Sequence, residues 1–267
     1  MKVLLVILPL AFALASANGN TTTSSSDEYL PENIITNGYA AGDGKIPYIV
    51  SLILGTDDSS SVAVCGGTII ANNWVLTAAH CLTTDYVDIH YGSDQRGSGQ
   101  FKHRVRSNNF IRHNLWLNSN GNDIGLIRTP RVRFTSKVNR VKLPKSKQQV
   151  GDSLENQWAV TCGWGVQANG QMANRLQCVD LEIMTNEECS KSYSVLPNGI
   201  LCGRSTDGKS TCAGDSGGPL VTRNDRTLVG VVSFFSGAGC MAGDPVGFTR
   251  VTAHLDWIRQ NSGVVYY

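Results

Sequence analysis

The sequence predicts an all-β domain. Short apolar or alternating runs of strand length recur along the chain, separated by turn residues. Glycine is abundant, with 28 residues, which suits a chain with many tight turns and close backbone approaches. Only two stretches carry a helical pattern. Many short strands followed by a terminal helix are typical of an all-β fold.

The first 17 residues have the features of a secretory signal peptide. Lys2 supplies a positive start, Val3 to Ala15 is apolar, and Ala15-Ser16-Ala17 offers small residues for cleavage after Ala17. An interfacial anchor is the alternative. The apolar run is short for a membrane span, and no later stretch reaches about 18 apolar residues, so we expect no membrane partner. The sequence therefore predicts a secreted protein.

Residues 18–34 are polar, rich in serine and threonine, and have little to bury. We expect this segment to be disordered. From Ile35 onward the strand pattern begins. The predicted strands are residues 47–54, 67–70, 74–77, 123–128, 157–161 and 228–233.

Two helical segments are expected in the second half of the chain. One is a turn over Thr185–Ser192, with Thr185 as its N-cap. The other covers Thr252–Asn261, where Leu255 and Ile258 share one face, and Gly263 follows as a stop signal.

Composition narrows the function classes. The chain has 267 residues, 16% charged and 41% hydrophobic, which suits a globular protein with a sizeable core. The formal net charge is +2, and no run of lysine or arginine exceeds two residues. We therefore expect no nucleic-acid partner and no basic recognition patch.

Eight cysteines fit a secreted protein with disulfides: Cys65, Cys81, Cys162, Cys178, Cys189, Cys202, Cys212 and Cys240. Their even number permits full pairing, but the pairing does not follow from the sequence alone. Zinc binding is the competing interpretation, and the absence of any C-x-x-C pair disfavours it.

One stretch carries the strongest chemical signal, Gly214-Asp215-Ser216-Gly217-Gly218-Pro219. Its structural alternative is a glycine-rich surface turn. A serine hydroxyl is a poor nucleophile unless a base lies within hydrogen-bond reach and a third group holds that base. His80 follows an apolar run in a turn of small residues beside a cysteine, and Asp123 stands at the head of another apolar run. The sequence therefore supplies all three groups.

The motifs around His80, Asp123 and Ser216, in that order, resemble those of the chymotrypsin family of serine proteases. The resemblance runs from about Ile35 to the C-terminus. In finer wording the chain is similar to insect digestive proteases of the Jonah group and to brachyurin-type enzymes, on the stretches 35–39, 176–180 and 255–258. The resemblance implies a protease domain over residues 35–267. Its expected fold is two packed six-stranded antiparallel β-barrels, with a connecting segment near residues 130–144 and a C-terminal helix.

The resemblance also implies a mechanism. Ser216 would be the nucleophile, His80 the general base and Asp123 the group that orients the base, as in the triad mechanism established for this family. The backbone N–H groups of Gly214 and Ser216 would form the oxyanion hole. No cofactor is implied. The loop that holds calcium in trypsins would lie near residues 92–105 and contains one acid, Asp94, so no metal is expected.

The sequence leaves more than one kind of substrate pocket open. The family's pocket floor lies six residues before the nucleophile, at Ser210, which is uncharged and would leave a buried arginine or lysine of a substrate unpaired. Ser233 is also expected in the pocket, and counting two residues on from it places a wall residue at Phe235. The second wall position falls at Val246, within residues 244–248. Bulk at both favours small or medium aliphatic side chains, as in elastase. If Phe235 turns outward, a chymotrypsin-like pocket remains. Asp244 is a third candidate, for attracting a basic residue.

Activation is expected to follow the family. Cleavage would make Ile35 the new amino terminus, which pairs with Asp215, and residues 18–34 would be the propeptide. The residue before this cut is Ile34, where the family has arginine or lysine. A cut after Asn33 is the alternative.

The resemblance implies the disulfides Cys65–Cys81, Cys189–Cys202 and Cys212–Cys240. Elimination then leaves a cross-strand disulfide between Cys162 and Cys178.

The expected function is a secreted digestive endopeptidase made as a zymogen, acting in a gut lumen. Its partners would be protein or peptide substrates and protease inhibitors, and we expect a monomer. The alternative is a catalytically silent, protease-like binding protein. In such proteins a catalytic residue is usually replaced, whereas here all three are present.

Overall fold

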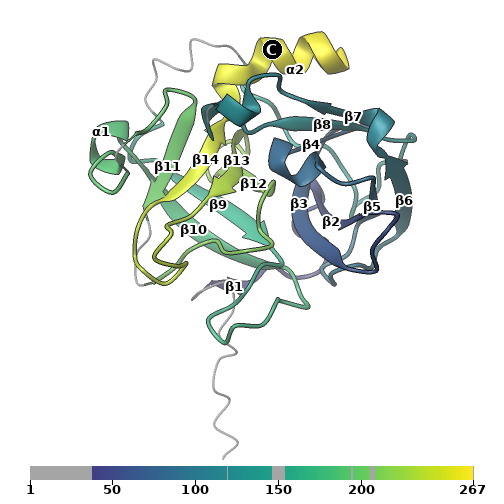
Figure 1. Ribbon diagram of the computed structural model, residues 1–267, viewed down its shortest axis with the longest axis horizontal. Coiled ribbons are helices and arrows are strands. Elements are labelled where there is room, and N and C mark those ends of the chain that lie inside the picture. The colour runs from purple at the N-terminus through teal and green to yellow at the C-terminus, as the bar shows by residue number, and fades with distance from the viewer. Residues whose placement is uncertain (1–37, 119, 146–153, 194, 205–207, 267) are drawn as a thin grey trace, which may run out of the picture. The chain divides into compact units, whose positions relative to one another are not determined.

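The computed structural model describes residues 38–118, 120–145, 154–193, 195–204 and 208–266. The expected signal peptide, the expected propeptide and Ile35 lie outside these residues. The described chain forms two antiparallel sheets, one built from the first half of the sequence and one mainly from the second half, and ends in a short helix (Figure 1). The all-β prediction with a C-terminal helix is confirmed.

The first sheet has the spatial order β6-β5-β2-β3-β4-β8-β7. Its strands are β2 (Ile49–Gly55), β3 (Val62–Ala71), β4 (Trp74–Thr77), β5 (Tyr86–Tyr91), β6 (Phe101–Arg106), β7 (Phe110–Arg112) and β8 (Gly125–Arg128). The edge strands β6 and β7 are consecutive in sequence, and only the 3₁₀ turn η2 (Ser107–Asn109) separates them. They stand at opposite ends of the strand order, so the chain passes from one edge of the sheet to the other at this turn.

The second sheet has the order β1-β10-β11-β14-β13-β12-β9. Its strands are β1 (Tyr39–Ala40), β9 (Trp158–Gly163), β10 (Gln177–Met184), β11 (Ile200–Arg204), β12 (Pro219–Thr222), β13 (Leu228–Phe234) and β14 (Val246–Arg250). An additional ladder between β9 and β10 closes six of these strands into a barrel, and β1 pairs with β10 outside it. The expected pair of equal barrels is therefore refined to one closed barrel and one open, curled sheet.

Both predicted helical segments are present. In the first, α1 (Asn186–Cys189), the Thr185 hydroxyl accepts a hydrogen bond from the Glu188 N–H at 3.0 Å, so Thr185 is the N-cap. The second, α2 (Leu255–Ser262), follows the 3₁₀ turn η6 (Val251–His254) and stops at Gly263, whose φ of 72° is the left-handed conformation that glycine adopts readily. No helix in the described part of the chain combines the length and apolar character that crossing a membrane requires.

Apolar side chains fix these elements in place. The largest core cluster fills the first sheet and includes Leu255 and Ile258 of α2, which are fully buried. A second cluster fills the closed barrel, with Leu181, Leu201 and Phe248 among its members. Burying one such side chain stabilises the fold by about 1.5–3 kcal/mol. The C-terminal helix α2 is thereby packed against the first sheet.

Candidate active site

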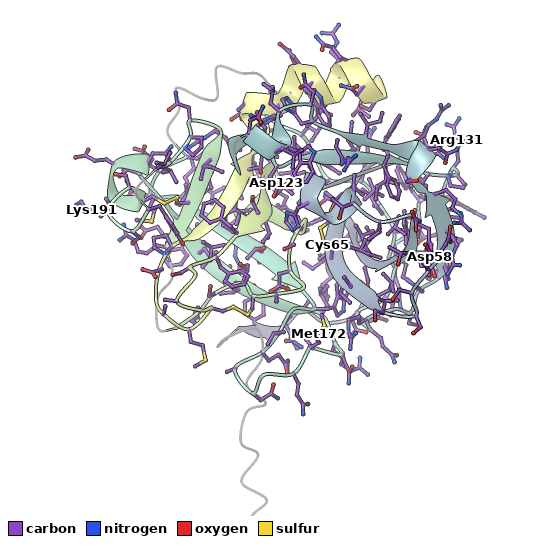
Figure 2. All side chains as sticks on the ribbon, in the orientation of Figure 1. Asp58, Cys65, Asp123, Arg131, Met172 and Lys191 are labelled. Atoms are coloured by element: carbon purple, nitrogen blue, oxygen red, sulfur yellow. A yellow bond between two sulfur atoms is a disulfide. The ribbon has the colours of Figure 1, made fainter. Side chains whose placement is uncertain are left out.

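The three predicted catalytic residues come from three separate elements. His80 lies in the 3₁₀ turn η1 (Ala79–Leu82), directly after β4. Asp123 lies between the 3₁₀ turn η4 (Asn120–Asn122) and β8. Ser216 lies in the turn before β12 of the second sheet. Figure 2 labels Asp123 between the two sheets.

His80 and Asp123 are held together by two hydrogen bonds. The His80 Nδ1 lies 2.7 Å from the Asp123 Oδ2, and the His80 backbone N–H donates to Oδ1 at 3.0 Å. A carboxylate only accepts, so Nδ1 carries a proton in this pair. In the neutral imidazole Nε2 then has its lone pair available. The ring is 37% exposed, whereas the carboxylate side chain is 9% exposed, so the imidazole faces solvent from a buried anchor.

Asp123 is held from the other sheet as well, through its carboxylate and its backbone carbonyl. The Ser233 hydroxyl donates to Oδ2 at 2.7 Å, and the Thr249 hydroxyl donates to the Asp123 backbone carbonyl at 2.8 Å. Burial raises the pKa of this carboxyl. The hydrogen bonds and charge of His80, together with the Ser233 hydroxyl, lower it by more than burial raises it, so the net pKa lies below its ordinary value. Asp123 therefore stays ionised beside the histidine.

The Ser233 side chain makes a contact that the sequence does not predict. Ser233 is expected in the substrate pocket, and its hydroxyl donates to Asp123. The register of β13 against β14 shifts between Val232 and Phe234, and such a bulge redirects the side chain at that point. Thr249 is a further contact that the sequence does not predict, since nothing in its local sequence marks it.

Strand β3 joins the turn of His80 to the turn of Ser216. Cys65 of β3 forms a disulfide with Cys81, the neighbour of His80. The next residue of β3, Gly66, donates its backbone N–H to the Ser216 carbonyl oxygen at 2.8 Å. The Cys81 sulfur lies 3.7 Å from that same carbonyl oxygen. Two adjacent residues of one strand thus bring the histidine and the serine turns side by side.

The turn from Cys212 to Ser216 requires glycine at position 214. Gly214 has a φ of 97°, which L side chains rarely adopt. A Cβ there would also lie 2.5 Å from the Met172 Cε. The Val166 N–H donates to the Ala213 carbonyl at 2.8 Å, so a neighbouring loop braces the turn. The backbone N–H groups of Gly214 and Ser216, predicted as the oxyanion hole, belong to this braced segment.

Asp215 is buried behind the turn, with 1% of its surface exposed. Its Oδ1 accepts the Gly165 N–H at 2.8 Å, and its Oδ2 accepts the Cys212 N–H at 2.9 Å. Burial raises the pKa of this carboxyl to about 6 although both hydrogen bonds lower it. A buried carboxylate of this kind is stabilised by a nearby cation. Ile35, the expected source of that cation, lies outside the described residues.

Two glycines make room for the Asp215 carboxylate. A Cβ on Gly163 would lie 2.1 Å from its Oδ1, and a Cβ on Gly165 would lie 2.4 Å from its Oδ2. Both glycines flank Trp164 in the sequence Cys162-Gly163-Trp164-Gly165. This Gly-Trp-Gly pattern is the signal that could have marked the close approach from sequence.

We expect Gly165→Ala to displace the Asp215 carboxylate and to lower peptidase activity strongly while the protein still folds. A methyl group cannot occupy a position 2.4 Å from an oxygen atom, and the buried carboxylate has little room to retreat. Gly237→Ala is the matched control, since a Cβ there meets nothing within 4 Å. Steady-state kinetics and a thermal melt of both variants check this. Equal activity of the two alanine variants would contradict it.

The remaining pocket residues take different positions. Ser210 is buried, with 2% exposure, and its hydroxyl donates to the Thr211 carbonyl at 3.0 Å. Val246 is fully buried in β14 and packs in the apolar cluster of the closed barrel. Phe235 is partly buried. The Asp244 carboxylate accepts a hydrogen bond from the Ser236 hydroxyl at 2.5 Å.

All four expected disulfides are present: Cys65–Cys81, Cys162–Cys178, Cys189–Cys202 and Cys212–Cys240. Cys162 and Cys178 face each other across β9 and β10, as the elimination argument requires. Cys65, His80 and Cys81 form the one group of potential metal ligands among the described residues. Both sulfurs are bonded to each other, so they cannot supply the thiolates that a zinc site of this type needs.

Comparisons with known proteins agree with this geometry. The Trypsin family model matches residues 35–258. Serine protease 1 of Drosophila melanogaster is 47% identical over 87% of this chain and 87% of its own length. Collagenase of Hypoderma lineatum is 39% identical over the full length of both chains, and Brachyurin of Leptuca pugilator is 37% identical over 86% of this chain and 99% of its own.

A solved structure, that of HL collagenase, superposes with a TM-score of 0.79 at 38% sequence identity and covers 86% of this chain and 99% of that chain. The family match spans most of the chain, from the first strand to the terminal helix, and includes the elements that hold His80, Asp123 and Ser216. The chain therefore belongs to the trypsin family of serine endopeptidases.

Proposed function

We propose that this protein cleaves peptide bonds through an acyl-enzyme intermediate on Ser216, with His80 as the general base and Asp123 as the group that orients it. The observation that carries the proposal is the anchored imidazole. Its Nδ1 is committed to a buried, ionised carboxylate at 2.7 Å, and the turns of His80 and Ser216 are tied to adjacent residues of one strand.

In the proposed reaction the Ser216 Oγ attacks the carbonyl carbon of the scissile bond while His80 Nε2 takes the hydroxyl proton. Asp123 stabilises the resulting imidazolium without taking its proton. His80 then gives the proton to the leaving amine. A water molecule then attacks the acyl-enzyme with the same help from His80 and frees Ser216. The backbone N–H groups of Gly214 and Ser216 would stabilise the negative oxygen of the tetrahedral intermediate, and such donors contribute about 3–4 kcal/mol each.

We infer that the protein is made as a zymogen that is activated by cleavage before Ile35. Asp215 supports this, because its buried carboxylate has a raised pKa and would gain from an ammonium group beside it. The same residue follows Gly214 directly, so pairing would order the turn that holds the oxyanion N–H groups. Secretion is proposed as well, because disulfides such as these four form and persist in oxidising compartments. A digestive role in a gut lumen is the expected setting.

The proposed substrates carry a small or medium apolar residue before the cut. Ser210, the expected pocket floor, is buried and offers no charge to a basic side chain, and the bulk of Phe235 is expected to narrow the pocket. Two relatives carry the names Collagenase and Brachyurin. For this chain we propose proteins in general as substrates and take no particular protein substrate from those names.

A panel of peptides that differ only in the residue before the cut tests this specificity on the activated protein. We expect turnover after alanine, valine or leucine to exceed turnover after arginine or lysine by roughly 100-fold, since burying an unpaired charge costs several kcal/mol. In Phe235→Gly the preference should move toward phenylalanine and tyrosine. A preference for arginine in the wild-type protein would overturn the assignment of Ser210 as the pocket floor.

The second candidate function is a catalytically silent binding protein. The departure at Ile34, where family members have arginine or lysine, is the observation that favours it. Mass spectrometry of the secreted protein's amino terminus separates the two: a terminus at Ile35 with peptide turnover supports the enzyme, and an intact propeptide without turnover supports the binding protein.

A further inference from the structure

The segment that links the two sheets carries a strong excess of positive charge. From the last residue of β8 to residue 145 the sequence contains seven cations, and no aspartate or glutamate occurs between Ile124 and Lys145. The cations are Arg128, Arg131, Arg133, Lys137, Arg140, Lys142 and Lys145. We call residues 128–145 the connector. No two of its charges are adjacent in the sequence, so the connector contains no basic run.

Hydrogen bonds lay the connector along one hairpin of the first sheet. The N–H groups of Thr129 and Val132 donate to the carbonyls of Asn73 and Asn72, at 3.0 and 2.7 Å. Further on, the Val141 N–H donates to the Ile69 carbonyl at 3.0 Å. Both ends of the connector thus lie on the β3–β4 hairpin. Val132 and Val141 are buried while their charged neighbours are exposed, so the charges face outward.

Most of these cations have no acidic partner among the residues that the structure describes. Lys137 pairs with Asp43, and on the adjacent strand β6 Arg104 pairs with Asp88 at 2.7 Å and Arg106 with Asp57 at 2.7 Å. Within the residues that the structure describes, no salt bridge is found for the following five cations: Arg128, Arg131, Arg133, Arg140 and Lys142. Among the described residues, no neighbouring carboxylate neutralises their charge.

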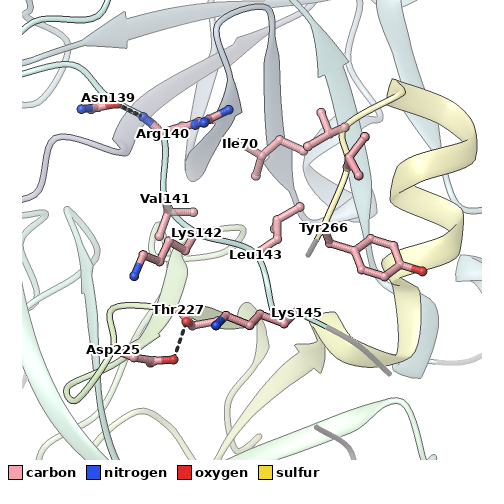
Figure 3. A pocket seen from close by; sticks show the side chains of 12 residues that line it. Ile70, Asn139, Arg140, Val141, Lys142, Leu143, Lys145, Asp225, Thr227 and Tyr266 are labelled. Atoms are coloured by element: carbon pink, nitrogen blue, oxygen red, sulfur yellow. Dashed lines mark hydrogen bonds between the residues drawn. The ribbon is translucent and has the colours of Figure 1, made fainter. Parts of the chain in front are cut away.

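Two hollows on this surface are lined by these cations. A groove of about 410 Å³ lies between β6 and the start of the connector, with Arg104, Arg106 and Arg128 beside the amides of Asn108 and Asn109. A pocket of about 450 Å³ lies at the other end of the connector, where Arg140 and Lys142 stand on one wall (Figure 3). Its acid, Asp225, is engaged by the hydroxyls of Thr222 and Thr227.

We propose that the connector is a binding surface for a sulfated polysaccharide. Four of these five cations are arginines, whose planar guanidinium binds tetrahedral oxyanions through two parallel hydrogen bonds and is more weakly hydrated than an ammonium. In the groove, Arg128 lies beside the amides of Asn108 and Asn109, which suit sugar hydroxyls.

The surface leaves the catalytic residues accessible. Arg128 stands at the far end of β8 from Asp123, five residues along an extended strand, which is about 16 Å. A polymer on the connector can hold the protein at a glycan-rich surface while peptides still reach His80 and Ser216. The inference does not depend on the proposed catalytic roles.

Salt-dependent binding of the full-length Ser216→Ala protein to immobilised heparin tests the proposal, since this protein cannot digest itself. In the triple variant Arg128→Gln, Arg131→Gln, Arg133→Gln, affinity at physiological salt should fall at least about tenfold, and the dependence of affinity on salt should become shallower, because fewer counterions are released. The matched control is Arg175→Gln, Lys191→Gln, Arg259→Gln, which removes the same charge elsewhere. Figure 2 shows Lys191 and Arg131 at opposite sides of the molecule.

Three results would overturn the proposal. The triple variant could bind heparin as the parent does, or the control variant could lose as much affinity, so that only net charge matters. Polyglutamate or double-stranded DNA could compete as well as soluble heparin at equal charge, in which case the surface does not select a sulfated polysaccharide. Loss in the triple variant alone, with heparin as the best competitor, supports it.

Discussion

Replacing Ser216 by alanine is expected to lower kcat by about a millionfold, the loss seen when the nucleophile of such a triad is removed. The substitution removes only a hydroxyl from a partly exposed side chain, while the Ser216 backbone, which accepts the Gly66 N–H, keeps its place. KM and the melting temperature should stay close to those of the parent. Steady-state kinetics of the activated protein measures kcat and KM, and a thermal melt gives the melting temperature.

Ser233→Ala is the informative control for Ser216→Ala. It also removes one serine hydroxyl near the site, but this hydroxyl donates to Asp123 and makes no bond to substrate in the proposed reaction. Losing a hydrogen bond to a charged group costs about 1.5–3 kcal/mol, so kcat should fall roughly 10- to 100-fold. Similar losses in the two variants, or more than a thousandth of the activity left in Ser216→Ala, would contradict the assignment of the nucleophile.

Replacing Asp215 by asparagine is expected to have the second largest effect. In the activated protein the new side chain keeps the shape but loses the charge that an ammonium at Ile35 would pair with. It also turns an amide N–H₂ toward either the Gly165 or the Cys212 N–H. Breaking a buried ion pair costs about 3–5 kcal/mol, which corresponds to roughly 100- to 4,000-fold in kcat if the turn at Gly214 loses its order.

In the uncleaved precursor, Asp215→Asn should stabilise the fold instead of weakening it. The reason lies in how the stability of the precursor depends on pH. The Asp215 pKa is raised from 3.8 to about 6, so between these values the native state binds more protons than the unfolded state. Its contribution to the free energy of unfolding is therefore full below about pH 4 and falls as pH rises through about 6, by roughly 3 kcal/mol. Asp215→Asn should lack this loss.

Urea unfolding of the Ser216→Ala precursor, with and without Asp215→Asn, measures this at pH values from 4 to 7. The difference between the two proteins isolates Asp215 from all other titrating groups. We expect the asparagine variant to gain relative stability as pH rises. A constant difference over this range would show that Asp215 is not a lone buried carboxylate in the precursor.

Local patterns predict much of this fold because they act over short distances. The predicted strand over residues 74–77 and the observed strand β4 (Trp74–Thr77) have the same bounds, because this stretch is apolar and bounded by turns. Thr185 caps its helix, and Gly263 ends the last one, because caps depend on a single side chain or a single φ value. The interruption between β6 and β7 is not predictable in this way, as it depends on how the sheet curls.

The contacts that complete the site depend on long-range register. Ser233 points at Asp123 because β13 is bulged against β14, and no pattern within β13 encodes that shift. Thr249 donates to the Asp123 carbonyl although the two residues are 126 positions apart in the sequence. The unpaired cations of the connector alternate with buried valines, so their common face follows from the hairpin beneath them.

Covalent labelling of Ser216 tests the central claim most directly. The activated protein is treated with a serine-directed sulfonyl fluoride, and the modified residue is located by peptide mass spectrometry while residual activity is followed. The account predicts one adduct, on the peptide that contains Ser216, formed in proportion to the activity lost, and no adduct in Ser216→Ala or His80→Ala. Full inhibition with the label on another residue, or continued turnover by a protein fully labelled at Ser216, would contradict it.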